Sequence, residues 1–427
     1  MKYFLPFIWS LLIAIPGWTQ LSCRSVDYRQ QQLRLHPELA IAVEANEQFT
    51  RRQLQPASVA VTGGATTAAN NSALPSLITI PVVVHVLYNT PAQNISDAQI
   101  RSQIDVLNRD YQKLNPDTAG IPSYYSPRAA NCGFQFVLAG LDTNGHTTSG
   151  IIRKHTNVTS FSLADNMKFS VSGGDDPWDR DRYLNIWVCN LEANVLGYSS
   201  LIGSPKESDG VVVNYSAFGT MGTAAAPYNL GRTTTHEIGH WLNLIHTWGD
   251  AYCGDDQVAD TPPQSQATYG DPTGIIISCG NTPYGNMYMN YMDFTDDIGM
   301  HMFTYGQRDR MVTLFAPGGF RYPLLSSDAA SKPALADSVA EARTGSNKIQ
   351  RFTLYPNPTV STVEVKLNDA GYLGSMLEVY DRMGQRVMAV RVTNLTFGLD
   401  VSRLAGGLYY IRVNDGKDPA GYSFVKL

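Results

Sequence analysis

The sequence predicts an α/β domain of the α+β type, with a twisted mixed sheet, a backing helix and a second helix near residue 236, followed by a small all-β sandwich. Three patterns lead to this fold class. Residues 78–87 form an apolar, β-branched run typical of a buried strand, and apolar residues recur at helical spacing between positions 100 and 111. Short alternating segments between turn residues fill positions 351–427, as in a β-sandwich. With 427 residues, the chain is long enough for at least two domains.

The first twenty residues have the layout of a secretory signal peptide. Lys2 precedes a mostly apolar stretch at 4–15 that is too short to span a bilayer, and cleavage is expected near residues 19–20. The mature protein is therefore expected to be exported and to lack a transmembrane segment. Acylation of Cys23, as in a lipoprotein, is the alternative, but the residues before Cys23 match an acylation site poorly.

The remaining chain divides by composition. Residues 21–76 are predicted to be a prosegment and a flexible link, which begins near residue 55 where Ala, Thr, Gly, Asn and Ser predominate. The main domain is expected at 77–325, followed by a linker at 326–350 and the sandwich at 351–427. Within the main domain the patterns predict helices at 97–114 and 307–315, and further strands at 134–139, 183–188 and 210–215. The part after residue 246 is expected to be irregular.

The charge of the chain argues against several classes of function. It carries 32 basic and 37 acidic residues, a net charge of -5, and so offers no electrostatic attraction for nucleic acid or an anionic membrane. No glycine-rich phosphate-binding motif follows a predicted strand. Nucleotide and dinucleotide chemistry are therefore not supported.

A short run at 236–246, with the sequence HEIGHWLNLIH, carries the strongest chemical signal. On a helix, residues four apart lie on the same face, so His236 and His240 point the same way with Glu237 beside them. His246 can join them only if the chain turns sharply near Asn243, a residue type that tolerates the left-handed conformation. Three imidazoles in this spacing predict a zinc site. The alternative, an amphipathic helix with histidines as surface residues, does not explain Glu237.

The ligand set indicates the chemistry. Three neutral imidazoles leave Zn²⁺ with its full charge and an open position for a water molecule whose pKa falls to about 7. Glu237 can take the proton of that water as general base and return it to the departing amine as general acid. The run therefore predicts hydrolysis of a peptide bond through a zinc-bound water.

A second motif lies downstream, at 290–294 (NYMDF) and 300–304 (MHMFT). Together with the zinc motif, it resembles the metzincin clan of zinc peptidases and, within that clan, the pappalysin family. The resemblance spans about residues 78–320. It implies a metzincin-like fold, a secreted zinc-dependent endopeptidase that acts on protein or peptide substrates, and a role for Met292 as the hydrophobic floor beneath the zinc.

The resemblance also implies accessory sites. Asp296 and Asp297 would line the pocket for the residue after the scissile bond and favour Arg or Lys there. Calcium would bind near Asp256 and Thr261, and the competing interpretation is a loop whose aspartates only cap and turn the chain. Cys23 would bind the zinc in a latent form, as a cysteine switch, and the competing interpretation is a spare thiol. Residues 50–52 (TRR) would then be a site for self-removal of the prosegment.

One position departs from the family pattern. Family members carry tyrosine two residues after the methionine, where the hydroxyl is thought to stabilise the tetrahedral intermediate, and this chain has Phe294. Phenylalanine cannot donate a hydrogen bond. Either Tyr291 or Tyr305 substitutes for it, or the enzyme is slower than its relatives.

Five cysteines in an exported protein suggest disulfides and leave one thiol over. Cys253 and Cys279 flank the segment between the third histidine and the methionine motif, and are expected to pair. Cys132 and Cys189 are then the natural second pair, although the sequence does not prove this connectivity. Cys23 remains free.

The segments Phe352–Thr359, Leu377–Gly384 and Leu404–Val413 resemble the C-terminal sorting domain of type IX secretion. This resemblance implies the type IX secretion machinery as a partner and a secreted or surface location in a Gram-negative bacterium. A carbohydrate-binding sandwich is the alternative for this domain. For the whole chain, which is expected to be a monomer, a non-catalytic zinc-containing surface adhesin and a hydrolase of non-peptide amides are the competing functions.

Overall fold

The computed structural model describes residues 22–55, 74–330, 352–355, 359–367, 372–381, 385–414 and 420–426. These residues belong to two compact units that divide after Ala334. The predicted signal peptide, most of the flexible link and most of the linker lie outside the described residues.

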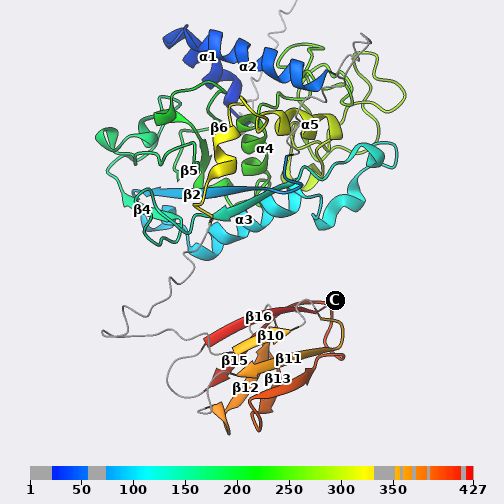
Figure 1. Ribbon diagram of the computed structural model, residues 1–427. Coiled ribbons are helices and arrows are strands. Elements are labelled where there is room, and N and C mark those ends of the chain that lie inside the picture. Colours follow the sequence, from blue (N-terminus) through cyan, green and yellow to red (C-terminus); the bar gives the residue numbers. More distant parts are fainter. Residues whose placement is uncertain are drawn as a thin grey trace, which may run out of the picture. The chain divides into compact units, whose positions relative to one another are not determined.

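The first unit is built on a seven-stranded mixed sheet in the order β1-β6-β7-β5-β2-β3, with β4 also paired to β2 (Figure 1). Strands β2 to β5 and β7 pair in parallel, and β6 runs antiparallel to β7. The mixed sheet is therefore confirmed, and the sequence patterns missed β4 and β6. The strands are β1 (Ser22–Cys23), β2 (Ile78–Tyr88), β3 (Phe134–Leu138), β4 (Ile151–His155), β5 (Leu184–Cys189), β6 (Val195–Ser199) and β7 (Val211–Asn214).

Two helices cover one face of this sheet. Helix α3 (Asp97–Tyr111) begins at Ser96, whose hydroxyl accepts a hydrogen bond from the backbone N–H of Gln99 at 3.1 Å. Its apolar side packs into the same core as β2 and β3, and the Tyr111 hydroxyl donates to the Thr235 carbonyl of α4 (Arg232–Trp241) at 2.9 Å. The backing helix therefore fixes the position of the helix that carries the zinc motif.

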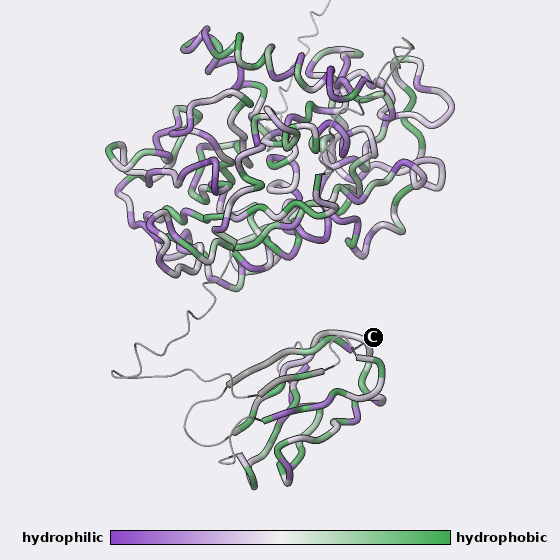
Figure 2. The backbone as a smooth tube through the Cα atoms, viewed as in Figure 1, coloured by the Kyte–Doolittle hydropathy of each residue, from purple (hydrophilic) through white to green (hydrophobic). Residues whose placement is uncertain are grey.

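The predicted prosegment contributes β1 and two helices, α1 (Ser25–Leu35) and α2 (Leu39–Leu54). Strand β1 extends the sheet by pairing with β6, and Tyr28 of α1 enters a core cluster around Trp187. Helix α2 packs against α5 (Tyr305–Thr313). Figure 1 shows α1 and α2 on the side of this unit opposite α3, and Figure 2 shows that both carry hydrophilic and hydrophobic residues along their length.

We call residues 78–241 the upper region and residues 242–330 the lower region. The lower region has little regular structure, as expected: it contains α5 and the short paired strands β8 (Tyr269–Gly270) and β9 (Phe294–Thr295), joined by loops and 3-10 turns. The predicted disulfide between Cys253 and Cys279 is confirmed, with Cα atoms 5.7 Å apart.

The second predicted disulfide is wrong. Cys132 and Cys189 are both free, and each thiol is buried in a different hydrophobic cluster. Cys132 lies just before β3 with the core on the helical face of the sheet, whereas Cys189 ends β5 and belongs to the cluster around Trp187. Burial raises the pKa of both thiols, so they behave as small apolar core residues.

The second unit consists of two antiparallel sheets, as predicted for a β-sandwich. Their orders are β10-β11-β14 and β13-β12-β15-β16. In β11 the side chains alternate between exposed and buried, which directs Val363, Val365 and Leu367 into the core. The strands are β10 (Phe352–Tyr355), β11 (Thr362–Leu367), β12 (Met376–Tyr380), β13 (Arg386–Arg391), β14 (Thr396–Asp400), β15 (Gly407–Asn414) and β16 (Ala420–Lys426). Among the described residues, no helix has the length and apolar character needed to cross a membrane.

Candidate metal centre

The start of helix α4 is held by a distant carboxylate, and its end is set by the local sequence. At the start, a carboxylate oxygen of Asp297 accepts hydrogen bonds from the backbone N–H groups of Leu230 (2.7 Å) and Arg232 (3.2 Å). At the end, Asn243 has a φ of 70°, and the Leu244 N–H donates to the Gly239 carbonyl at 2.9 Å. The predicted left-handed turn at Asn243 is confirmed, and it returns the chain toward the helix.

This turn brings His246 to the two histidines of the helix. The three Nε2 atoms of His236, His240 and His246 lie 3.0 to 3.2 Å from one another. The Nδ1 atoms donate hydrogen bonds away from the cluster. His236 donates to the Tyr291 carbonyl at 2.6 Å and His240 to the Leu244 carbonyl at 2.9 Å, and His246 donates to the Asp250 carboxylate at 2.5 Å. Because every Nδ1 carries the proton, three Nε2 lone pairs face one another.

The donor set fits a zinc ion. Burial, reinforced by the neighbouring imidazoles, lowers the pKa of His236 well below its usual value and the pKa of His240 to about 3, so these rings stay neutral and can bind a cation. Cys23 completes the group: its Sγ and the three histidine nitrogens lie within 4.8 Å of one another. In the described part of the chain, this is the one such cluster of metal-binding side chains. Three imidazoles and a thiol are typical zinc ligands.

The methionine motif lies directly beneath α4. Met292 is fully buried, and a Cβ added at Gly239 would lie only 2.4 Å from its sulfur. The backbone of the same turn supports the histidines, because the Tyr291 carbonyl accepts from His236 and the Met292 carbonyl accepts from the Thr247 N–H at 3.2 Å. Met292 therefore packs against the helix that carries the first two histidines.

Phe294 packs against the imidazoles. Its ring centroid is 4.8 Å from that of His246 and 5.6 Å from that of His236, and Trp248 stacks on His246 at 4.3 Å. Neither tyrosine proposed from the sequence replaces the missing hydroxyl. Tyr291 is fully buried with its hydroxyl near Arg232, at 3.2 Å, and Tyr305 is 44% exposed at the start of α5.

Glu237 is fully buried beside the histidines, and the predicted prosegment covers it. The Ser25 hydroxyl donates to Glu237 Oε2 at 2.8 Å and accepts from the Ser199 N–H of β6 at 3.0 Å. Burial raises the pKa of Glu237 to about 8. Burial and the nearby Glu237 also raise the pKa of the Cys23 thiol, so a thiolate at this position requires a cation beside it.

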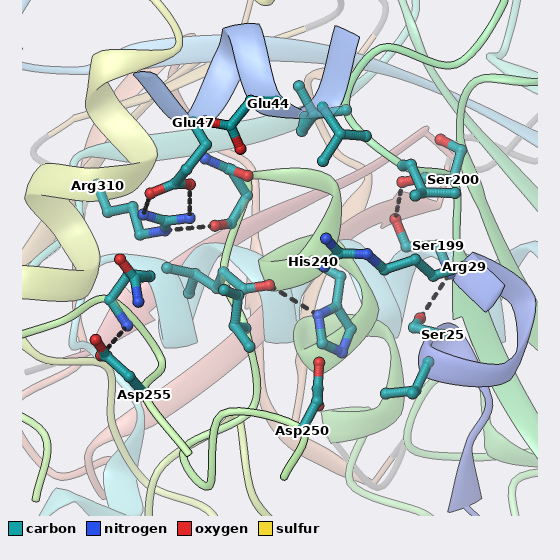
Figure 3. Close-up of a pocket in the computed structure, with 18 of the residues that line it drawn as sticks. Ser25, Arg29, Glu44, Glu47, Ser199, Ser200, His240, Asp250, Asp255 and Arg310 are labelled. Carbon is teal, nitrogen blue, oxygen red and sulfur yellow. Dashed lines mark hydrogen bonds and ion pairs between the residues drawn. The ribbon is translucent and has the colours of Figure 1, made fainter. Parts of the chain in front are cut away.

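Two cavities adjoin the histidines. A small cavity of about 30 Å³ lies beside His236 and Glu237 and is lined by Asp297, Tyr228 and Phe294, whereas Asp296 does not line it. Burial raises the pKa of Asp297 to about 6. A larger chamber of about 290 Å³ lies on the other side, between α1, α2 and the body of the unit (Figure 3). Helices α1 and α2 therefore cover the space next to His240.

The predicted calcium residues lie close together. The Thr261 hydroxyl contacts both carboxylate oxygens of Asp256, at 2.7 and 2.9 Å, and the Val258 N–H donates to Asp256 at 3.1 Å. Burial raises the pKa of Asp256 to about 7. A buried carboxyl with a hydroxyl beside it offers hard oxygen donors, but the described side chains show no cluster of acidic groups there.

The sequence patterns missed two residues of this centre. Asp250 supports His246, and the four-residue spacing between them was an available signal. Ser25 carried no such signal, because its contact with Glu237 joins segments 212 residues apart.

The fold and the histidine cluster place the chain among the zinc metalloendopeptidases, which are hydrolases. Comparison with known proteins narrows this class. Residues 171–316 match the family model described as pregnancy-associated plasma protein-A. An extracellular metalloprotease of Pyricularia oryzae is 32% identical over 275 residues, which cover 62% of this chain and 84% of that protein. The chain therefore belongs to the pappalysin family.

Solved structures agree with this assignment. Mature mirolysin of Tannerella forsythia, in complex with a cleaved peptide, is 49% identical with a TM-score of 0.58, and the match covers 58% of this chain and 96% of that chain. A promirolysin mutant of the same organism is 43% identical with a TM-score of 0.64, and the match covers 71% and 97%. Residues 353–425 match a secretion system C-terminal sorting domain. The protein is accordingly a metalloprotease that is secreted or located at the cell surface.

Proposed function

We propose that this chain is a latent endopeptidase in which His236, His240 and His246 hold a catalytic zinc ion and Glu237 moves the proton. One observation carries the proposal: three Nε2 lone pairs converge within 3.2 Å, next to a buried carboxyl group. When bound, zinc supplies the Lewis acidity that polarises a peptide carbonyl and acidifies water.

Glu237 acts as general base and then as general acid. Its carboxyl group takes the proton of the attacking water and returns it to the departing amine. The position of the carboxyl group supports this role, because Glu237 directly follows the first histidine on α4 and lines the small cavity together with it.

Latency follows from the position of the prosegment. Cys23 occupies the fourth side of the histidine cluster, and Ser25 engages Glu237, so both reactive groups are covered at once. Strand β1 also takes the edge of β6, where an extended substrate could add to the sheet. The resemblance to promirolysin over 71% of the chain supports a zymogen.

Specificity depends on the small cavity that includes Asp297. A carboxylate there favours Arg or Lys after the scissile bond, although two backbone N–H groups already engage it. With Phe294 in place of tyrosine, one transition-state hydrogen bond is absent, and such a loss costs roughly two to three orders of magnitude in rate. We infer a slower enzyme than relatives that keep the tyrosine.

The remaining parts of the proposal concern assembly and location. Calcium at Asp256 and Thr261 stays a prediction, and a rise in thermal midpoint on addition of CaCl₂ that is absent in Asp256→Asn would support it. The sorting domain directs the chain through the type IX secretion machinery of a Gram-negative bacterium. The protein acts as a monomer.

The test is Glu237→Ala. We expect the variant to retain zinc and to lose about two to four orders of magnitude in peptide hydrolysis, because the ligands stay and the proton acceptor is removed. Because Glu237→Ala cannot process itself, an added protease first removes the prosegment from every variant, and size-exclusion chromatography verifies that it has left. Zinc is then measured by mass spectrometry and turnover with a fluorogenic peptide library, which also reports any preference for Arg or Lys. Glu207→Ala, at an exposed glutamate, is the control. Wild-type turnover by Glu237→Ala would refute the assignment.

A further inference from the structure

A tyrosine of the prosegment is buried in the hydrophobic cluster around Trp187, which does not contain the histidines. Tyr28 lies on α1 and is 0% exposed. Its hydroxyl donates to a carboxylate oxygen of Asp165 at 2.6 Å, and its ring lies 4.6 Å from that of Tyr198, at a tilt of 35°. A side chain of the removable segment is thus part of the core of the unit that it must eventually leave.

The surroundings of Tyr28 form a polar and aromatic site. The other oxygen of Asp165 accepts from the Tyr198 hydroxyl at 2.9 Å and pairs with Lys168 at 2.9 Å. Lys168 is 0% exposed, and its ammonium group lies 5.2 Å from the Tyr28 ring centroid and 5.6 Å from that of Trp187. A buried cation over aromatic faces, paired with a carboxylate, binds a phenol by ring contact and by hydrogen bonding together.

We propose that Asp165, Lys168, Trp187 and Tyr198 form a binding socket for a tyrosine side chain, and that Tyr28 in this socket keeps the prosegment bound after the link to the catalytic unit is cut. The latent state then outlasts cleavage, and dissociation of the prosegment becomes a separate step in activation.

Other contacts of the prosegment would also keep it bound after the link is cut. Helix α2 is tied to α5 by hydrogen bonds from Arg310 to Glu47 at 3.1 and 2.5 Å, and Arg51 donates to Gln257 at 2.9 Å. None of these contacts requires the covalent link at 56–73. The predicted self-cleavage residues 50–52 lie inside α2, with Thr50 fully buried, so they are protected from a first cut while α2 stays folded.

The socket is separable from the metal. Its residues belong to the cluster on the face of the sheet opposite α4, and Tyr28 is five positions after Cys23. A cysteine switch alone predicts that Cys23 holds the prosegment. The socket predicts that Tyr28 does so even when Cys23 is absent.

The experiment measures retention of the cut prosegment in the full chain. The Glu237→Ala background prevents self-processing, and a recognition site for a sequence-specific protease is inserted between residues 60 and 61. After cutting, size-exclusion chromatography with mass spectrometry gives the rate at which residues up to 60 leave. Because this readout needs no catalysis, a failure of the proposed chemistry leaves it interpretable.

Four variants decide the outcome. We expect the parent and Cys23→Ala to keep the fragment. Tyr28→Phe should release the fragment about tenfold faster, because the side chain loses its hydrogen bond to the Asp165 carboxylate, and Tyr28→Ala should release it faster still. Gln30→Ala, on the exposed part of α1, should match the parent. Equal release by Tyr28→Phe, Tyr28→Ala and the parent would overturn the proposal, as would loss from Cys23→Ala alone. The thermal midpoint of each uncut variant verifies folding.

Discussion

The upper and lower regions of the catalytic unit fix their parts of the metal centre in different ways. In the upper region, the sheet and α3 hold α4, and the helical period places His236 and His240 one turn apart. The lower region has little regular secondary structure, and its chain direction is set by turns. Five residues that are not glycine have a positive φ in these turns: Asn243, Asp250, Cys253, Gln257 and Cys279.

The difference extends to the support of each ligand. His236 and His240 donate to backbone carbonyl groups, which no substitution can remove, whereas His246 donates to the side chain of Asp250. The third ligand therefore depends on a local loop, on its carboxylate and on the disulfide that closes the next segment. Changes in the lower region should weaken the site without disturbing the upper sheet.

Removal of the disulfide is expected to have the largest effect on stability. The Cys253→Ser and Cys279→Ser double variant frees a loop of 26 residues in the unfolded state and should lose about 3 kcal/mol in the free energy of unfolding. Denaturant unfolding followed by tryptophan fluorescence measures this loss. Reductant should lower the unfolding midpoint of the wild type to that of the variant and should not affect the variant. If the variant and the wild type have the same midpoint without reductant, the bridge does not stabilise the fold.

Asp250→Ala tests the support of the third ligand. The His246 Nδ1 proton loses its acceptor, and loss of such a partner typically weakens metal affinity by about 10-fold to 100-fold. Competition with a chromophoric chelator measures zinc affinity. Asp255→Ala removes the same charge from an exposed position in the same loop and serves as the control. Identical zinc affinities in the two variants would show that Asp250 does not orient the ring.

Gly239→Ala tests the contact between the regions. In an exposed helix this change stabilises by about 1 kcal/mol, but here the new Cβ would lie 2.4 Å from the Met292 sulfur. Overpacking of this kind costs about 1 to 3 kcal/mol, so the sign reverses and the thermal midpoint falls. Shortening the partner in Gly239→Ala with Met292→Ala should remove the collision. A higher midpoint in the single variant would mean that Met292 does not pack under the helix.

The same contrast explains what the sequence could predict. The zinc helix, the turn at Asn243 and the buried strand β2 follow from local periodicity and from residue conformational preference, and these predictions are confirmed. Strand β4 (IIRKH) ends in three basic residues and β6 (VLGYS) contains Gly197, so neither forms an apolar, β-branched run that a local pattern would mark.

Contacts between distant segments were the main limit. Pairing of Cys132 with Cys189 was inferred by elimination, but two thiols can each be satisfied by apolar burial in separate clusters. Asp297 lines the small cavity beside His236, and its role in specificity stays a prediction. Its hydrogen bonds to the start of α4 depend on a fold that brings residues 230 and 297 together. The contacts of Tyr28 with Asp165 and Tyr198 also join distant segments, so no local pattern indicated the socket.

The most direct test of the account is X-ray absorption at the zinc edge, on the intact chain and on the processed enzyme. The account predicts one zinc per chain with three nitrogen ligands in both forms, and a sulfur ligand from Cys23 in the intact chain that is replaced by oxygen after the prosegment has left. A shell without sulfur in the intact chain, or four protein ligands in the processed enzyme, would contradict it.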